Sequence, residues 1–271
     1  MDVRGVARWL TIAGGLAFLV VGAIFFVAPN ISAANFPWNV SPMVAMTIGA
    51  WALGMGAIAV DCGVRWNLHR SYAALVLVWV FGILELLVVV QFLGVLRTDH
   101  WLTWPYLIAL GLTAAAAVPG AIAVYKARDE IREPGERIPA WVRFFIFSFI
   151  IVVGFLAASL FLRTADTPGQ QLFPEPLTLF TVRAFSAFFA SLVAGAAALL
   201  VSRDVAAPVE LARVGLYLIV PIIIATLANL GSFDFSARPG GLIYIGAYVL
   251  TGALAAFSVW WYRSRSSAPS G

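Results

Sequence analysis

Eight stretches of about twenty mostly apolar residues follow one another along this chain, and each is long enough to cross the roughly 30 Å hydrocarbon core of a membrane as a helix. They span residues 6–28, 42–62, 71–96, 103–125, 141–162, 177–201, 209–230 and 241–262. The chain is 62% hydrophobic and 11% charged, whereas soluble domains carry about 25% charged residues. The sequence therefore predicts an all-α integral membrane protein with eight transmembrane helices.

The first stretch, residues 6–28, also follows the pattern of a secretory signal, because two arginines precede it. Its apolar run is longer than the roughly 7 to 15 residues of a signal-peptide core. We therefore interpret it as the first span.

The positive charges predict the orientation. Thirteen of the 17 Lys and Arg residues fall on one side: Arg4, Arg8, Arg65, Arg70, Lys126, Arg128, Arg132, Arg137, Arg143, Arg203, Arg213, Arg263 and Arg265. The other side has Arg97, Arg163, Arg183 and Arg238. Because cytoplasmic connections carry the excess of Lys and Arg, we expect both termini in the cytoplasm. The same bias explains the net charge of +4 without nucleic acid as a partner.

A weak internal repeat divides the chain. With a shift of 137 positions and no gap, residues 36–60 align with 173–197, and five of the 25 pairs are identical. Ser41 aligns with Thr178, and small residues such as Ala50 recur in both copies. Four spans precede the longest polar segment and four follow it, so the two halves should share one orientation, related by an axis along the membrane normal.

This division predicts a first four-helix repeat at 1–126, a cytoplasmic linker at 127–139, a second four-helix repeat at 140–262, and a disordered basic tail at 263–271. Pro119 and Pro221 lie inside spans and should kink or break their helices.

Glu85 is the residue that most needs an explanation, because a charge at the centre of a transmembrane helix costs about 2.5 to 3.5 kcal/mol. It fits a proton-titrating or ligand-binding carboxylate, and it also fits a structural ion pair or a hydrogen-bonded neutral acid. Arg183 could pair with it across the two halves or extend outward to headgroups. Asn229, in the seventh span, could line a shared cavity or form an interhelical hydrogen bond.

Phe36, Trp38 and Phe173 mark the turns that lead into the second and sixth spans. Aromatic rings of this kind are enriched at membrane interfaces, so we expect these three to lie flat there, with Trp38 able to stack on a headgroup or a carbohydrate. Carboxylates of the outer loops, such as Glu175, are expected to be solvated. Asp61 and Asp204, at the inner ends of two spans, are also expected to be solvated.

Motifs for catalysis, metals and cofactors are absent. The chain has one cysteine and two histidines, and both histidines lie in connections. It has no P-loop, dinucleotide motif, paired metal-binding histidines or nucleophile elbow. We therefore predict no catalytic residue, no metal and no cofactor.

The turn 36–38 with Ser41, Pro42 and the Gly49-Ala50-Trp51 run resembles a group of uncharacterised bacterial multi-pass membrane proteins, in which a Trp-Pro-Trp-like turn precedes a Gly-Ala-Trp helix. The resemblance covers about a fifth of the chain, and the second half departs from it. It implies a bacterial inner membrane and carries no known activity.

Three functions stay open. The favoured one is a non-enzymatic protein that binds or transports an apolar or weakly charged small molecule, with Glu85, Arg183 or Asn229 in a cavity. The second is a scaffold subunit of a larger membrane complex, and the third is a membrane-embedded enzyme. The predicted partners are membrane lipid and either another membrane subunit or a second copy of the chain.

Overall fold

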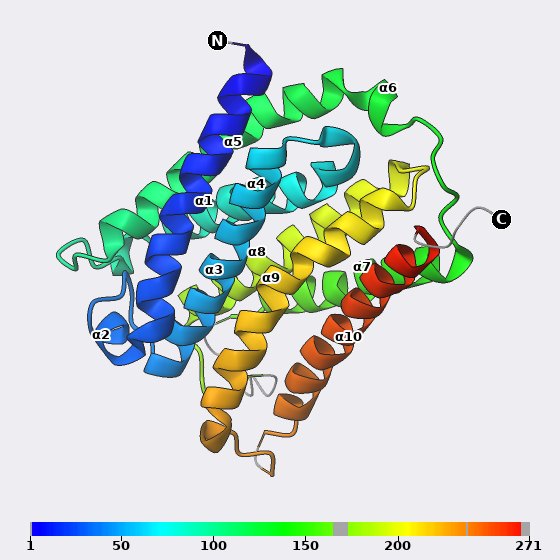
Figure 1. Ribbon diagram of the computed structural model, residues 1–271. Coiled ribbons are helices and arrows are strands. Elements are labelled where there is room, and N and C mark those ends of the chain that lie inside the picture. Colours follow the sequence, from blue (N-terminus) through cyan, green and yellow to red (C-terminus); the bar gives the residue numbers. More distant parts are fainter. Residues whose placement is uncertain (1, 165–172, 237, 267–271) are drawn as a thin grey trace.

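The computed structural model describes residues 2–164, 173–236 and 238–266, and every regular element in this part of the chain is a helix (Figure 1). The eight long helices are α1 (Val3–Val27), α3 (Pro42–Arg65), α4 (Leu68–Gln91), α5 (Thr103–Lys126), α7 (Ala140–Phe161), α8 (Leu179–Ala198), α9 (Ala206–Ala228) and α10 (Gly240–Ser266). Between them lie the short helices α2 (Pro29–Ala34) and α6 (Arg128–Ile131), and the single 3-10 turns η1 (Leu93–Val95), η2 (Leu199–Val201) and η3 (Leu230–Ser232).

The long helices are those of a multi-pass membrane protein. Each has the length and the apolar composition to cross a membrane, with α8 extended by η2. The structure therefore has the eight long apolar helices that the sequence predicts. The helices α5 and α9 continue through Pro119 and Pro221, so the expected breaks at these prolines are not found.

Two ends of the bundle can be distinguished. The linker with α6, the N-terminus of α1 and the C-terminus of α10 all lie at one end, which we call the linker end (Figure 1). An ion pair of 3.2 Å between Arg265 and Glu136 joins α10 to the linker there. The helices α3 and α8 begin at the opposite end, which we call the pocket end.

The helices α3, α4 and α8 form the centre of the bundle. The two halves meet where α3 packs against α9 and where α4 packs against α8. Within the first half, α1 packs against both α3 and α5. The helices α7 and α10 lie at the periphery, with most of their surface uncovered by protein, as expected for helices that face lipid.

The helices of the two halves begin at a nearly constant interval. Their first residues are Val3 and Ala140, Pro42 and Leu179, Leu68 and Ala206, and Thr103 and Gly240, which gives separations of 137, 137, 138 and 137 positions. The turns η1 and η3 are also 137 positions apart.

A network of four charged residues joins α3 to α9 at the linker end. The guanidinium groups of Arg65 and Arg213 both contact the carboxylates of Asp61 and Glu210. The Asp61 side chain is 21% exposed, so the expectation of a simply solvated carboxylate is wrong. The neighbouring helix fixes its position, because Arg213 belongs to α9.

The linker docks on the start of α9. His69 contacts the Glu130 carbonyl at 2.8 Å and the Asp204 carboxylate at 3.0 Å. A Cβ on Gly135 would lie 2.3 Å from the Asp204 carboxyl carbon. The linker therefore packs against Asp204 so closely that residue 135 has no space for a side chain. Asp204 is 8% exposed, which contradicts its expected solvation.

The structure also corrects the predicted tail. Residues 263–266 belong to α10, so this part of the segment is helical and not disordered. Residues 267–271 lie outside the part of the chain that the structure describes.

Candidate functional site: a pocket between the halves

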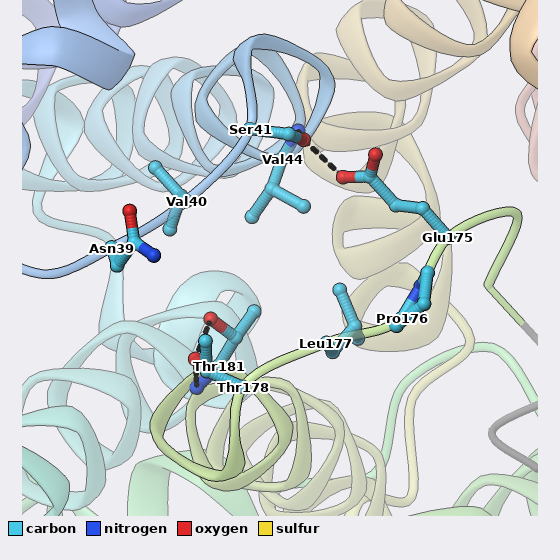
Figure 2. A pocket seen from close by; sticks show the side chains of 9 residues that line it. All are labelled: Asn39, Val40, Ser41, Val44, Glu175, Pro176, Leu177, Thr178 and Thr181. Atoms are coloured by element: carbon cyan, nitrogen blue, oxygen red, sulfur yellow. Dashed lines mark hydrogen bonds between the residues drawn. The ribbon is translucent and has the colours of Figure 1, made fainter.

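A cavity of about 280 Å³ opens at the pocket end, between the N-termini of α3 and α8 (Figure 2). It is lined by Asn39, Val40, Ser41, Val44, Glu175, Pro176, Leu177, Thr178 and Thr181. This volume is near the lower limit of small-molecule sites and equals that of about nine liquid water molecules at ≈ 30 Å³ each.

The lining comes from corresponding positions of the two halves. Residues 39, 40, 41 and 44 lie 137 positions before residues 176, 177, 178 and 181. The remaining member is Glu175. Each half therefore contributes the turn before a central helix and the first turn of that helix.

Both central helices are capped in the cavity wall. The Val44 amide donates to the Ser41 hydroxyl at 3.1 Å, and the Thr181 amide donates to the Thr178 hydroxyl at 3.3 Å. Ser and Thr are favoured at this position because their oxygens accept from the free amides of the first turn. The two caps fix where the hydroxyl groups lie.

Glu175 is the one charged residue of the lining. Its carboxylate accepts a hydrogen bond from the Ser41 hydroxyl, and Figure 2 shows the two side chains extended toward each other, with Thr178 and Thr181 across the cavity. The positive ends of two helix dipoles face the same space and are complementary to this carboxylate. The site thus combines hydroxyl groups, an amide and one carboxylate.

Four rings pack against one another beside the cavity and are called the aromatic layer: Phe36, Trp38, Tyr106 and Phe180. Trp38 stacks on Phe180 with ring centroids 4.1 Å apart, and its indole donates to the Thr181 hydroxyl at 3.0 Å. The ring of Tyr106, from α5, lies 5.7 Å from that of Trp38. Thr181, which lines the cavity, therefore links the lining to the aromatic layer.

These rings correct a prediction. Phe36, Trp38 and Phe173 are 0%, 1% and 3% exposed, so the expected flat, exposed position at the interface is wrong for all three. Trp38 packs between the halves of the protein, where no headgroup can stack on it.

Glu85 lies deeper in the bundle, six residues before the end of α4. It is 1% exposed, and neither carboxyl oxygen has a hydrogen-bond partner in the described chain. Glu85 is therefore a buried carboxyl group that lies apart from the residues lining the cavity.

Arg183 does not pair with Glu85. Its guanidinium donates to the carbonyl groups of Leu160, Phe161 and Arg163, at the C-terminus of α7. The last carbonyls of a helix lack the regular intrahelical donors, and a cation suits the negative end of a helix dipole. Arg183 therefore braces α7 against α8.

Asn229 follows the last residue of α9. Its amide donates to the Ala225 carbonyl at 2.8 Å and to the Met46 sulfur at 3.3 Å. Glu85 lies six residues inside its own helix, so the two polar groups are not at matching depths. The structure does not bring Glu85, Arg183 and Asn229 together, and none of the three lines the cavity.

The groups that do line the cavity were not predicted as a site. Glu175 was expected to be one of several solvated loop carboxylates, and Ser41 and Thr178 were noted only as a pair in the repeat. A usable signal existed, because a cap residue followed by a helix start occurs at the repeat interval in both halves.

Groups of three or more potential metal ligands are not found among the described residues. Comparison with protein-family models, with curated protein sequences and with solved structures gives no significant match.

Proposed function

We propose that this chain is a non-enzymatic carrier that binds a small, weakly charged molecule in the pocket between its halves and moves it toward Glu85. The observation that supports the proposal is an open cavity between the two halves, in a bundle that also buries a carboxyl group without a hydrogen-bond partner among the described residues. Burying an ionisable group inside a membrane lowers stability, so a residue of this kind is a functional-site candidate by default.

The proposed architecture is a duplicated four-helix unit with parallel halves. The helix starts at intervals of 137 or 138 residues support it. The packing between the halves also supports it. In the repeat α3 corresponds to α8 and α4 corresponds to α9, so the α3–α9 contact is equivalent to the α8–α4 contact. The cavity would then lie on the axis that relates the repeats, as expected for sites in transporters built from repeats.

The proposed membrane is the bacterial inner membrane, with the linker end in the cytoplasm. The excess of Lys and Arg at that end supports this orientation. In this arrangement the cavity opens to the outer face. The aromatic layer and the four-residue charged network at the linker end close the other side.

A substitution that fills the cavity with a large side chain tests the binding site. We expect wild-type protein, released from its own membrane in native conditions, to retain a small-molecule mass in native mass spectrometry. Val40→Trp should lose it, because the indole occupies most of a cavity of about 280 Å³. Leu242→Trp is the matched control, since Leu242 is 59% exposed on α10 and lies outside the cavity lining.

The same spectra distinguish the alternatives. Equal small-molecule masses in wild type and Val40→Trp would contradict the proposed site. A tightly retained protein mass in all three samples would instead favour a scaffold subunit.

A further inference from the structure

The two halves differ where the first and last helix of each half meet. In the first half α1 packs along α5, and a Cβ on Gly14 would lie 2.6 Å from the Thr113 hydroxyl. The residues 137 positions later are Ile151 and Leu250, which are 69% and 61% exposed. In the second half, large side chains thus stand at the positions where Gly14 and Thr113 let the helices α1 and α5 pack closely.

As a result, α7 and α10 have no comparable backbone packing in the described chain. They touch through aromatic rings at the linker end, where Trp141 lies 5.9 Å from Phe257 and 5.3 Å from Trp261. Toward the pocket end, a narrow niche lies between α7, α8 and α10. It is lined by Leu160, Arg163, Phe173, Leu177, Phe185, Phe189 and Tyr244.

The niche has space for about 20 Å³, which is enough for one methylene or methyl group and no more. A longer chain would have to continue along the exposed apolar faces of α7 and α10, where Phe155 and Leu250 lie uncovered. This shape fits an acyl chain better than a compact ligand.

Three arginines lie around this niche. Of the four arginines at the pocket end, only Arg97 belongs to the first half. Arg163 lines the niche, Arg183 donates to the Arg163 carbonyl at 2.9 Å, and Arg238 donates to the carbonyl of Phe173 at 3.4 Å. The residues 137 positions before these three arginines are Phe26, Met46 and Trp101, which are uncharged.

We propose that the junction of α7 and α10 at the pocket end binds an anionic phospholipid. Arg163 and Arg238 contact its phosphate, and one acyl chain lies between the two helices. Guanidinium groups match phosphate oxygens in geometry and charge. The proposal rests on the chain spanning a membrane and is independent of the carrier function.

The test compares two lipids that differ only in the headgroup. Delipidated protein in a neutral detergent is titrated with phosphatidylglycerol or with phosphatidylcholine of the same acyl chains, and bound lipid is counted by native mass spectrometry. We expect tighter binding of phosphatidylglycerol. Removing one arginine charge should weaken it about fivefold, the factor that corresponds to the contribution of one basic residue near an acidic lipid.

Three variants make the result specific. Arg163→Gln and Arg238→Gln should each lose much of the preference for phosphatidylglycerol, while Arg97→Gln should keep it. Arg183 is left unchanged because it braces α7. The thermal midpoint of each variant in phosphatidylcholine shows that it is folded.

Equal binding of the two lipids by wild-type protein would overturn the proposal, and so would an equal loss in Arg97→Gln. A third arm uses inorganic phosphate. Displacement of the bound lipid by millimolar phosphate would indicate a simple anion site and would also overturn it.

Discussion

Replacing Glu85 by leucine is expected to stabilise the protein and to abolish transport. A buried polar group without a partner lowers stability by about 1 to 3 kcal/mol, and Glu85 has no partner for either oxygen. Leucine has a similar size and no polar group. The thermal midpoint in detergent should therefore rise, by about 2 to 4 °C for each kcal/mol in a protein of this size.

The part of this prediction that concerns function distinguishes binding of the small molecule from its transport. The small molecule that Val40→Trp loses should remain bound in Glu85→Leu, because Glu85 does not line the cavity. Uptake of that molecule into proteoliposomes should fall to background. Ile222→Leu is the matched control, since Ile222 stands 137 positions after Glu85 and is also fully buried. A lower midpoint in Glu85→Leu than in this control would show that Glu85 is a structural residue.

The second large effect is expected at Gly22, where α1 crosses α3. A Cβ there would lie 2.6 Å from the Leu53 backbone nitrogen, and backbone cannot move aside as a flexible side chain can. Because close contact of small residues is the main attraction between helices in lipid, Gly22→Ala should cost about 1 to 3 kcal/mol. Thermal unfolding in detergent measures this as a lower midpoint.

Gly111→Ala provides the opposite case. Gly111 is also inside a long helix, but a Cβ there would have no neighbour within 4 Å. Alanine is the better helix former by about 1 kcal/mol, so this variant should be unchanged or slightly stabilised. Equal losses in the two variants would contradict the assigned role of the α1–α3 contact, because Gly111 has no such contact.

The eight helices could be predicted because the hydrocarbon core sets their length, and that signal is local in the sequence. The prediction of 6–28 for the first span compares with Val3–Val27 in the structure. Helix ends are harder to predict, since capping and connection geometry shift them by a few residues. Asn229 shows this, because it lies just past the end of α9 and not within a span.

The site could not be predicted because its contacts join residues far apart in the chain. Trp38 is buried by Thr181 and Phe180, which follow it by more than 140 positions, and a tryptophan at the start of a span is usually interfacial. Glu175 meets Ser41 across a separation of 134. Arg183 caps a helix that ends more than twenty residues earlier, a role that charge counting cannot reveal.

Maleimide labelling in intact cells tests the central claim, that the pocket opens to the outer face while the linker lies in the cytoplasm. In a Cys62→Ala background, Asn39→Cys and Glu133→Cys place one exposed thiol at each end. A membrane-impermeant maleimide should label Asn39→Cys in intact cells and Glu133→Cys only after permeabilisation. Labelling of Glu133→Cys in intact cells, or protection of Asn39→Cys until permeabilisation, would contradict the account.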